Sequence, residues 1–193
     1  MRRLIHLWDP IARKLMGIRP TAPGSIAGYS IRRYPGRSLT GADGSRIRRG
    51  ERVLEVHIDS RLLEERTAGL TAHQRSLYLR REMIAGLQAY ARLLSADPAL
   101  EDVRGLWALT LIHRGVDLLG FTVIDLPGGL TRWLSTLYLK WILAAYHPDG
   151  DDRLHQREEA LVPKEIFMSR EVLLSRYGQE RRRERKPKVN KAE

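Results

Sequence analysis

The sequence predicts a single α+β domain, and three patterns lead to this fold class. Residues 53–59 alternate apolar side chains with charged or polar ones, as a strand with one buried face does. Residues 72–94 carry apolar side chains at the spacing of a helix with one buried face. Residues 103–112 are apolar toward both faces, which is typical of a central strand. Because a long helix connects the two strands, we expect them to pair in parallel through a right-handed crossover.

The domain is expected to begin with a β-hairpin region and to continue with a strand–helix–strand–helix–strand unit and a mostly buried apolar helix. Glycine, proline and polar capping residues mark the expected boundaries. In order, the predicted elements are a strand at 26–34, turns at 42–45 and 49–50, a strand at 53–59, a short helix at 61–65, a helix capped by Thr71 and running to about Leu94, a strand at 103–112, a short helix at 113–119, a strand at 121–126, an apolar helix at 130–146, a strand at 162–168 and a helix capped by Ser169 and ending at Gly178.

The formal net charge of +11 is concentrated at the two ends of the chain. Residues 1–20 contain five basic and one acidic side chain, and residues 181–193 contain seven basic and two acidic ones, which leaves +2 for residues 21–180. We therefore expect three segments. They are an amphipathic basic helical segment at 1–19 with a break at Pro10, a single α+β domain at 20–178, and a basic tail at 179–193 that is disordered alone.

Several classes of protein are excluded by what the sequence lacks. It has no cysteine, so disulfides, thiol nucleophiles and cysteine-bound metals are absent. The first residues contain no continuous apolar stretch of the kind found in signal peptides, and the longest apolar stretch, 133–146, is shorter than the ~18–20 residues that span a bilayer. We expect a cytoplasmic protein. Phosphate-loop, dinucleotide-fold, serine-elbow and HExxH motifs are all missing.

Polar residues follow the two strands that we expect to be parallel. Glu55, His57 and Asp59 share the polar face of the first strand, and His113-Arg114 follow the second. Ligands bind at the carboxyl ends of such strands, where two histidines and a carboxylate could act as acid and base or hold a divalent metal. Arg114 could bind a phosphate or a carboxylate. The alternative is that His57 and Asp59 lie on a solvated strand face and that His113 only precedes a helix.

The chain resembles the YkoP-like domain, a bacterial family that occurs alone or joined to polysaccharide deacetylase domains and that has no established activity. The resemblance implies a connection with the cell envelope, and it adds His147, Pro148 and Lys164 to the candidate residues. Ser60 stands where the family often has asparagine, and the deacetylase's own metal motif is absent. The matching segments are His6-Leu7-Trp8-Asp9, Leu54-Glu55-Val56-His57-Ile58-Asp59, Leu111-Ile112-His113-Arg114-Gly115, Leu119-Gly120-Phe121-Thr122-Val123, Tyr146-His147-Pro148-Asp149-Gly150 and Val162-Pro163-Lys164-Glu165.

The leading hypothesis is a membrane-peripheral protein, at the inner face of the membrane, that acts in cell-envelope polysaccharide or lipid-linked precursor metabolism. In it, His57, Asp59, His113 and Arg114 carry the chemistry of a polar pocket, and Glu55, Ser60, His147 and Lys164 help to bind an anionic small ligand. The basic ends would meet an anionic membrane surface. One alternative is a non-catalytic interaction module that docks through the helices at 1–19 and 130–146. Another is nonspecific nucleic-acid binding through the basic tail. The sequence identifies no cofactor, no metal and no oligomeric state.

Overall fold

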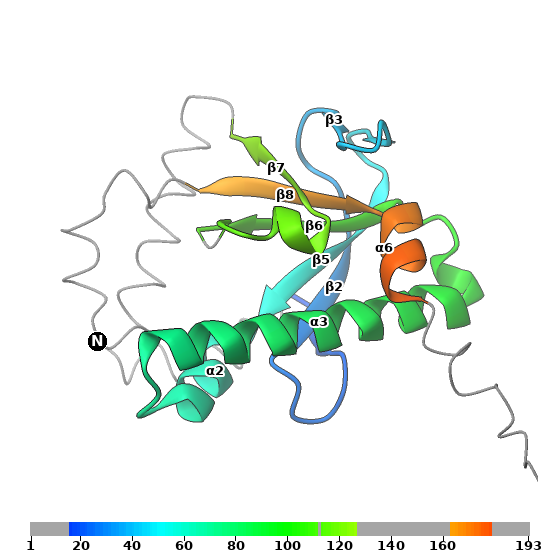
Figure 1. Cartoon of the computed structure of the whole chain (residues 1–193). Helices are drawn as coiled ribbons and strands as arrows, with labels where there is room; N and C mark the ends of the chain where they lie inside the picture. Colours follow the sequence, from blue (N-terminus) through cyan, green and yellow to red (C-terminus); the bar gives the residue numbers. More distant parts are fainter. Residues whose placement is uncertain (1–15, 112, 127–162, 179–193) are drawn as a thin grey trace, which may run out of the picture.

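A six-stranded sheet forms the centre of the molecule, and one long helix crosses a face of it (Figure 1). The computed structural model describes residues 16–111, 113–126 and 163–178. It confirms the predicted α+β class, with the strand order β1-β2-β5-β6-β8-β7 and a separate two-stranded hairpin, β3-β4. The strands are β1 (Arg19–Pro20), β2 (Ala27–Arg33), β3 (Leu39–Thr40), β4 (Arg46–Ile47), β5 (Arg52–Ile58), β6 (Gly105–Thr110), β7 (Thr122–Asp125) and β8 (Lys164–Ser169). The α-helices are α2 (Ser60–Thr67), α3 (Ala72–Ala96) and α6 (Arg170–Tyr177), and η1 (Pro98–Leu100) and η2 (Asp117–Leu119) are 3-10 turns.

Strands β5 and β6 pair in parallel, as the sequence predicts. Leu54 lies opposite Leu106, and Glu55 lies opposite Trp107. The other neighbouring pairs in the sheet are antiparallel. Because β5 and β6 run in the same direction, their carboxyl ends meet at one end of the sheet. Polar residues that follow these two strands are therefore brought to the same end of the molecule.

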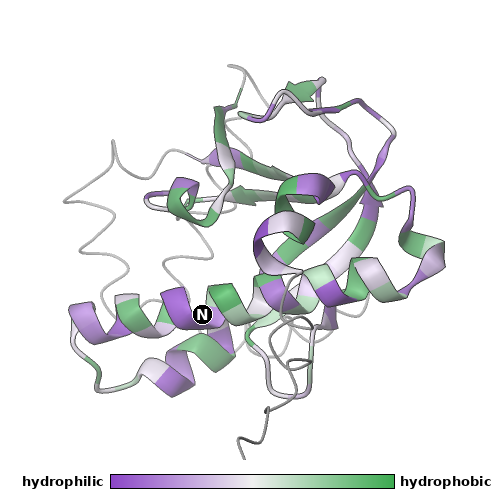
Figure 2. Ribbon diagram, turned by 45° about the vertical axis from the view of Figure 1, so that its right-hand side comes forward, coloured by the Kyte–Doolittle hydropathy of each residue, from purple (hydrophilic) through white to green (hydrophobic). Residues whose placement is uncertain are grey.

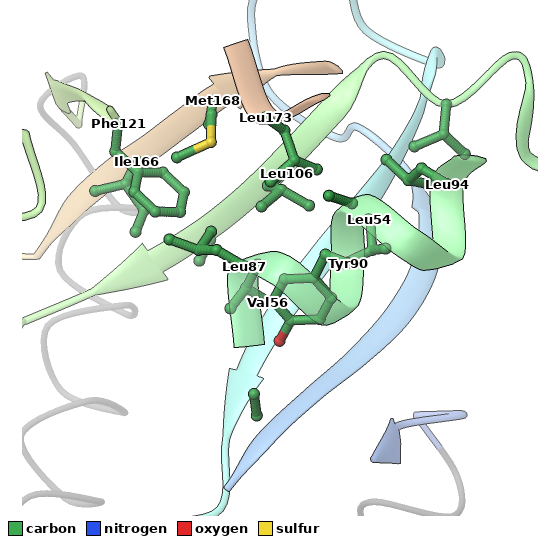
Figure 3. Packing of buried hydrophobic residues seen from close by; sticks show 14 of the residues in the cluster. Leu54, Val56, Leu87, Tyr90, Leu94, Leu106, Phe121, Ile166, Met168 and Leu173 are labelled. Atoms are coloured by element: carbon green, nitrogen blue, oxygen red, sulfur yellow. The ribbon is translucent and has the colours of Figure 1, made fainter. Parts of the chain in front are cut away.

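The larger core lies between the sheet and helices α3 and α6, on what we call the helix face (Figure 3). Leu87, Tyr90 and Leu94 of α3 are at most 1% exposed and pack with Leu54 and Leu106 of the sheet. Hydrophobic and hydrophilic residues alternate along α3, as they do in a helix with one buried side (Figure 2). The predicted buried stripe is thus confirmed in the second half of the helix.

The β3-β4 hairpin covers the opposite side of the sheet, which we call the hairpin face. Leu39 and Ile47 of the hairpin pack with Val53, Trp107 and Phe167 of the sheet. Neighbouring residues Leu106 and Trp107 thus enter different cores, as predicted for a strand that is buried on both faces.

Helix boundaries follow local capping signals in the sequence. Thr71 and Gln74 form a reciprocal capping box at the start of α3. The Ser169 hydroxyl accepts a hydrogen bond from the Val172 amide at the start of α6, and Gly178 is the C-cap of that helix. The predicted caps Thr71 and Ser169 and the predicted stop at Gly178 are confirmed.

The structure corrects several local predictions. The helix expected at 113–119 is only the 3-10 turn Asp117–Leu119, since a left-handed Gly115 interrupts the segment. The helical segment expected at 1–19 gives way from residue 16 to a turn and to β1, which is only two residues long and therefore has no periodicity to detect. The spacing of apolar residues in 72–94 also places Leu77 on the buried side of α3, but Leu77 is 52% exposed, because the start of α3 extends past the end of β5 (Figure 1).

Three predicted features lie outside the described residues. They are most of the amino-terminal helix (1–15), the apolar helix 130–146 and the tail 179–193. Among residues 16–111, 113–126 and 163–178, no helix combines the length and the apolar character needed to cross a bilayer.

Gly105→Ala is expected to lower the free energy of unfolding by about 2–4 kcal/mol, because a Cβ at this position would lie 2.2 Å from the carbonyl oxygen of Met168 on the paired strand. Urea denaturation measures the loss. Gly44→Ala is the matched control, since its Cβ meets no atom within 4 Å and only the positive φ is strained, at a cost of about 1 kcal/mol. Equal losses in the two variants would contradict the close approach at Gly105.

Candidate functional site

A serine, a glutamate and a histidine meet across strands β2 and β5 on the hairpin face, and we call them the Ser30–Glu55–His57 group. The antiparallel register places Ser30 opposite Glu55 and Gly28 opposite His57. The Ser30 hydroxyl donates to Glu55 Oε2 at 3.1 Å and lies 3.0 Å from Nε2 of His57. Glu55 Oε2 lies 3.4 Å from the same nitrogen. Ser30 is only 3% exposed, so the hydroxyl that contacts the other two residues is buried.

The Glu55 carboxyl is held in its ionised form by its neighbours. Burial would raise its pKa, but the hydrogen bond and charge of His57, the charge of Arg32 and the hydrogen bond from Ser30 together lower the pKa below its usual value. Arg32 Nε lies 3.1 Å from Glu55 Oε2. Glu55 therefore combines one negative charge with three polar neighbours, and its lowered pKa suits a hydrogen-bond acceptor rather than a base.

This group lacks the geometry of a serine nucleophile relay. In such a relay the histidine takes the hydroxyl proton on one ring nitrogen while the acid holds the other nitrogen. Here the Ser30 hydroxyl and the Glu55 carboxylate both approach Nε2 of His57, so the acid does not hold the ring nitrogen opposite the serine. Ser30 thus contacts both Glu55 and His57 without the geometry of a nucleophile.

Asp59 and Ser60 belong to the start of α2. The Asp59 side chain accepts a hydrogen bond from the Leu62 amide at 2.9 Å, which makes Asp59 the N-cap of the helix, and Ser60 is the first helical residue. The Asp59 amide also donates to the Ile26 carbonyl of the neighbouring chain segment. Asp59 thus ends β5 and begins α2.

Histidine, arginine and lysine side chains gather where β6 ends, and we call His113, Arg114 and Lys164 the basic group. Lys164 begins β8, opposite Thr110 of β6 on one side and Asp125 of β7 on the other, and its amine forms an ion pair with Asp125. The pKa of His113 lies below its usual value, chiefly because of burial and then because of the positive charges of Lys164 and Arg114, which outweigh Asp125. The basic group is therefore a site of positive potential.

The two groups lie on different parts of the sheet. Residues paired across strands share a face, so Glu55 and His57 lie on the hairpin face with Trp107, while Lys164 and Asp125 lie on the helix face with Ile166. Strand β6 separates β5 from β8. The structure thus brings together Glu55 with His57, and His113 with Arg114 and Lys164. His147 lies outside the described residues.

A buried glutamate was missed by the sequence reasoning. Glu165 is 6% exposed on the hairpin face, where its Oε1 accepts hydrogen bonds from the Tyr34 hydroxyl at 3.1 Å and from Trp107 Nε1 at 3.2 Å. Burial raises the pKa of Glu165 despite these two hydrogen bonds, and it also raises the pKa of Tyr34. A charged residue followed by Ile166-Phe167-Met168 in a predicted strand was the available signal.

Metal ligation finds no support in the described part of the chain. Within residues 16–111, 113–126 and 163–178, no three histidine, aspartate or glutamate side chains are grouped so that they could hold an ion.

Glu165→Gln and Glu55→Gln are expected to change the pH dependence of stability in opposite directions. The pKa of Glu165 is raised in the folded state, so its contribution to stability is lost as the pH rises through that value. The pKa of Glu55 is lowered, so its contribution is lost as the pH falls. As the pH rises above about 4, the wild type should lose stability relative to E165Q, whereas as the pH falls below about 5 it should lose stability relative to E55Q.

Urea midpoints measured at several pH values provide this comparison. Circular dichroism at neutral pH must first show that both variants keep the wild-type fold. For each variant, the difference between its urea midpoint and that of the wild type is plotted against pH. If this difference changed with pH in the same direction for E165Q and E55Q, the opposite environments of the two carboxyls would be contradicted.

The family of the chain is established by its match to a known domain. A family model described as the YkoP domain matches residues 1–177, and this range includes both groups of candidate residues. No curated protein and no solved structure gives a significant match. Because the model covers far more than half of the 193 residues, the chain belongs to the YkoP domain family.

Proposed function

We propose that this YkoP-domain protein binds an anionic ligand at the basic group and acts in cell-envelope polysaccharide or lipid-linked precursor metabolism at the cytoplasmic face of the membrane. The observation that carries the proposal is the convergence of His113, Arg114 and Lys164 at the end of β6. Open α/β sheets bind ligands at the carboxyl ends of parallel strands, and β6 is the parallel partner of β5.

Positive charge at the basic group favours an anion. Lys164 and Arg114 both depress the pKa of His113, so their charges are felt at the imidazole ring. A bound anion would offset this repulsion and would gain from two cations. Asp125 pairs with Lys164 and offsets part of the positive charge. Because the Asp125 carboxylate is exposed, water weakens this ion pair, and an incoming anion can compete for Lys164.

Each member of the basic group has a distinct role in the proposal. The exposed guanidinium of Arg114 can bind a phosphate or a carboxylate through two parallel hydrogen bonds. Lys164 acts as a point charge, fixed at the start of β8. His113, with its pKa lowered, supplies a neutral ring nitrogen that can accept a proton from the bound ligand. Phosphate esters, pyrophosphates and acidic sugars fit this set of groups.

The envelope part of the proposal rests on the family. YkoP-like domains that are joined to polysaccharide deacetylases point to carbohydrate chemistry at the envelope. Lipid-linked sugar precursors carry a phosphate or a pyrophosphate, which is the chemistry that the basic group would recognise. In this proposal His57 and Asp59 lie outside the anion site, since His57 is held by Ser30 and Glu55 and Asp59 caps α2.

A second candidate function is a non-catalytic interaction module. The observation that favours it is the exposure of two large apolar side chains, Leu118 at 79% and Leu77 at 52%. They belong to separate elements, η2 and α3, and a docking patch requires contiguous apolar area. The basic group therefore carries the stronger argument.

Pyrophosphate is expected to raise the pKa of His113 in the wild type, because a bound anion stabilises the protonated ring. A pH titration of the ring proton resonance by NMR, with and without pyrophosphate, measures the shift. Lys164→Gln should by itself raise the pKa of His113, since it removes a cation that depresses it, and it should also weaken the response to pyrophosphate.

His73 provides an internal control, because it lies exposed in the first turn of α3, outside the basic group. Its resonance should not respond to pyrophosphate beyond the effect of an equal ionic strength of chloride. Equal responses of His113 and His73, or an unchanged response of His113 in K164Q, would contradict the proposed anion site.

A further inference from the structure

A positively charged surface lies on the β3-β4 hairpin, although the body of the chain is nearly neutral as a whole. Residues 32–52 contain seven arginines and only two acidic side chains, which gives this short segment a formal charge of +5. Residues 21–180 together carry only +2, so the remainder of that range is net negative. Positive charge within the body is therefore concentrated in one part of the fold.

Both acidic side chains of this segment bond to groups other than the arginine side chains of the hairpin. Asp43 accepts a hydrogen bond from the Ser169 hydroxyl at 2.5 Å and another from the Ser45 hydroxyl at 2.6 Å. Glu51 accepts from the Arg48 backbone amide at 2.6 Å and lies 3.8 Å from Arg104. Neither carboxylate pairs with an arginine side chain of the hairpin in these contacts.

Four arginines of the hairpin remain exposed, and we call Arg37, Arg46, Arg48 and Arg49 the hairpin arginines. Within the described part of the chain, their side chains form no hydrogen bond or ion pair. Three other arginines nearby do have acidic partners: Arg32 pairs with Glu55, Arg52 with Asp102 and Arg104 with Glu51. The hairpin arginines thus present four uncompensated charges.

The backbone that carries these charges is held firmly against the sheet. Ile47, between Arg46 and Arg48, is fully buried, so its two neighbours point outward. The Ala42 amide donates to the Thr122 hydroxyl of β7 at 2.8 Å, and Asp43 is bonded to Ser169 of β8. Such a platform presents the guanidinium groups with little loss of backbone entropy on binding.

We infer that the hairpin arginines dock the protein on an anionic phospholipid surface, an inference that rests on the membrane location proposed above. Guanidinium groups bind phosphate through paired hydrogen bonds, and each basic side chain near an anionic bilayer strengthens binding about fivefold. The hairpin lies on the face of the sheet opposite α3, so the hairpin arginines can reach the lipid without obstruction by that helix.

A lipid surface fits this region better than a nucleic acid does. Tyr34, the aromatic residue within 32–52, is only 1% exposed, so the hairpin offers no ring on which a base could stack. Strands β3 and β4 are two residues each, which is too short a ribbon to follow a DNA groove. A flat array of phosphates requires neither feature.

The test is co-sedimentation of full-length protein with vesicles of phosphatidylglycerol and phosphatidylcholine, compared with phosphatidylcholine alone. The hairpin variant carries Arg37→Gln, Arg46→Gln, Arg48→Gln and Arg49→Gln. The matched control removes four exposed arginines from α2, α3 and α6 by Arg61→Gln, Arg80→Gln, Arg81→Gln and Arg176→Gln. A third variant neutralises Arg2, Arg3, Arg13 and Lys14. The three variants have the same formal net charge, since each loses four positive charges. Circular dichroism must first show that each variant is folded.

We expect the hairpin variant to bind the anionic vesicles several-hundredfold more weakly at low salt, at about fivefold for each arginine. Binding of the control variant to the same vesicles should weaken by less than about fivefold. Equal losses in both variants would overturn the inference, because net charge alone would then explain binding. Loss confined to the amino-terminal variant would overturn it while leaving the proposed membrane location intact. Failure of the wild type to bind anionic vesicles would overturn both the inference and the proposed membrane location. If duplex DNA is retained by the wild type in a gel-shift assay but not by the hairpin variant, the partner is a nucleic acid and not a lipid.

Discussion

Burial of β6 on both faces fixes the positions of the strands around it. Leu106 and Ala108 pack beneath α3 and α6, while Trp107 enters the opposite core and its ring meets that of Tyr34 edge-to-face with centroids 5.6 Å apart. A shift of one residue would exchange these two sets of side chains, so the register of β6 with β5 and β8 is strongly specified. Both polar groups of the candidate site depend on this register, because β5 supplies Glu55 and β8 supplies Lys164.

The hairpin face holds two glutamates, Glu55 and Glu165, whose environments shift the carboxyl pKa in opposite directions. Trp107 lies opposite Glu55 in the parallel pair and donates its indole hydrogen to Glu165. Both carboxyls are partly desolvated, but Glu55 is compensated by Arg32 and His57, whereas Glu165 receives only neutral donors. Charged neighbours stabilise an ionised carboxylate far more than neutral ones do, so the pKa falls at Glu55 and rises at Glu165.

The composition of the candidate site was only partly predictable. Alternation along one strand placed Glu55 and His57 on one face, and the structure agrees. Their partner Ser30 comes from another strand, and Asp59 turned out to cap a helix, because the chain bends as soon as β5 ends. Lys164 reaches Asp125 through an antiparallel pairing that connects residues about forty positions apart. Likewise, the near-neutral net charge of residues 21–180 gave no indication of the hairpin arginines, because a net charge does not show which carboxylates lie close to which arginines.

The fold class, the parallel pair of strands, the buried stripe in the second half of α3 and the helix caps at Thr71 and Ser169 all followed from the sequence. These features depend on periodicity and on hydrogen bonds within a few residues, which any stretch of sequence displays directly. The folded structure was needed to show which side chains meet across strands, in which direction the pKa of each glutamate moves, and which arginines have no partner among the described residues. Those outcomes depend on strand register and burial, and both are set by contacts between residues far apart in the chain.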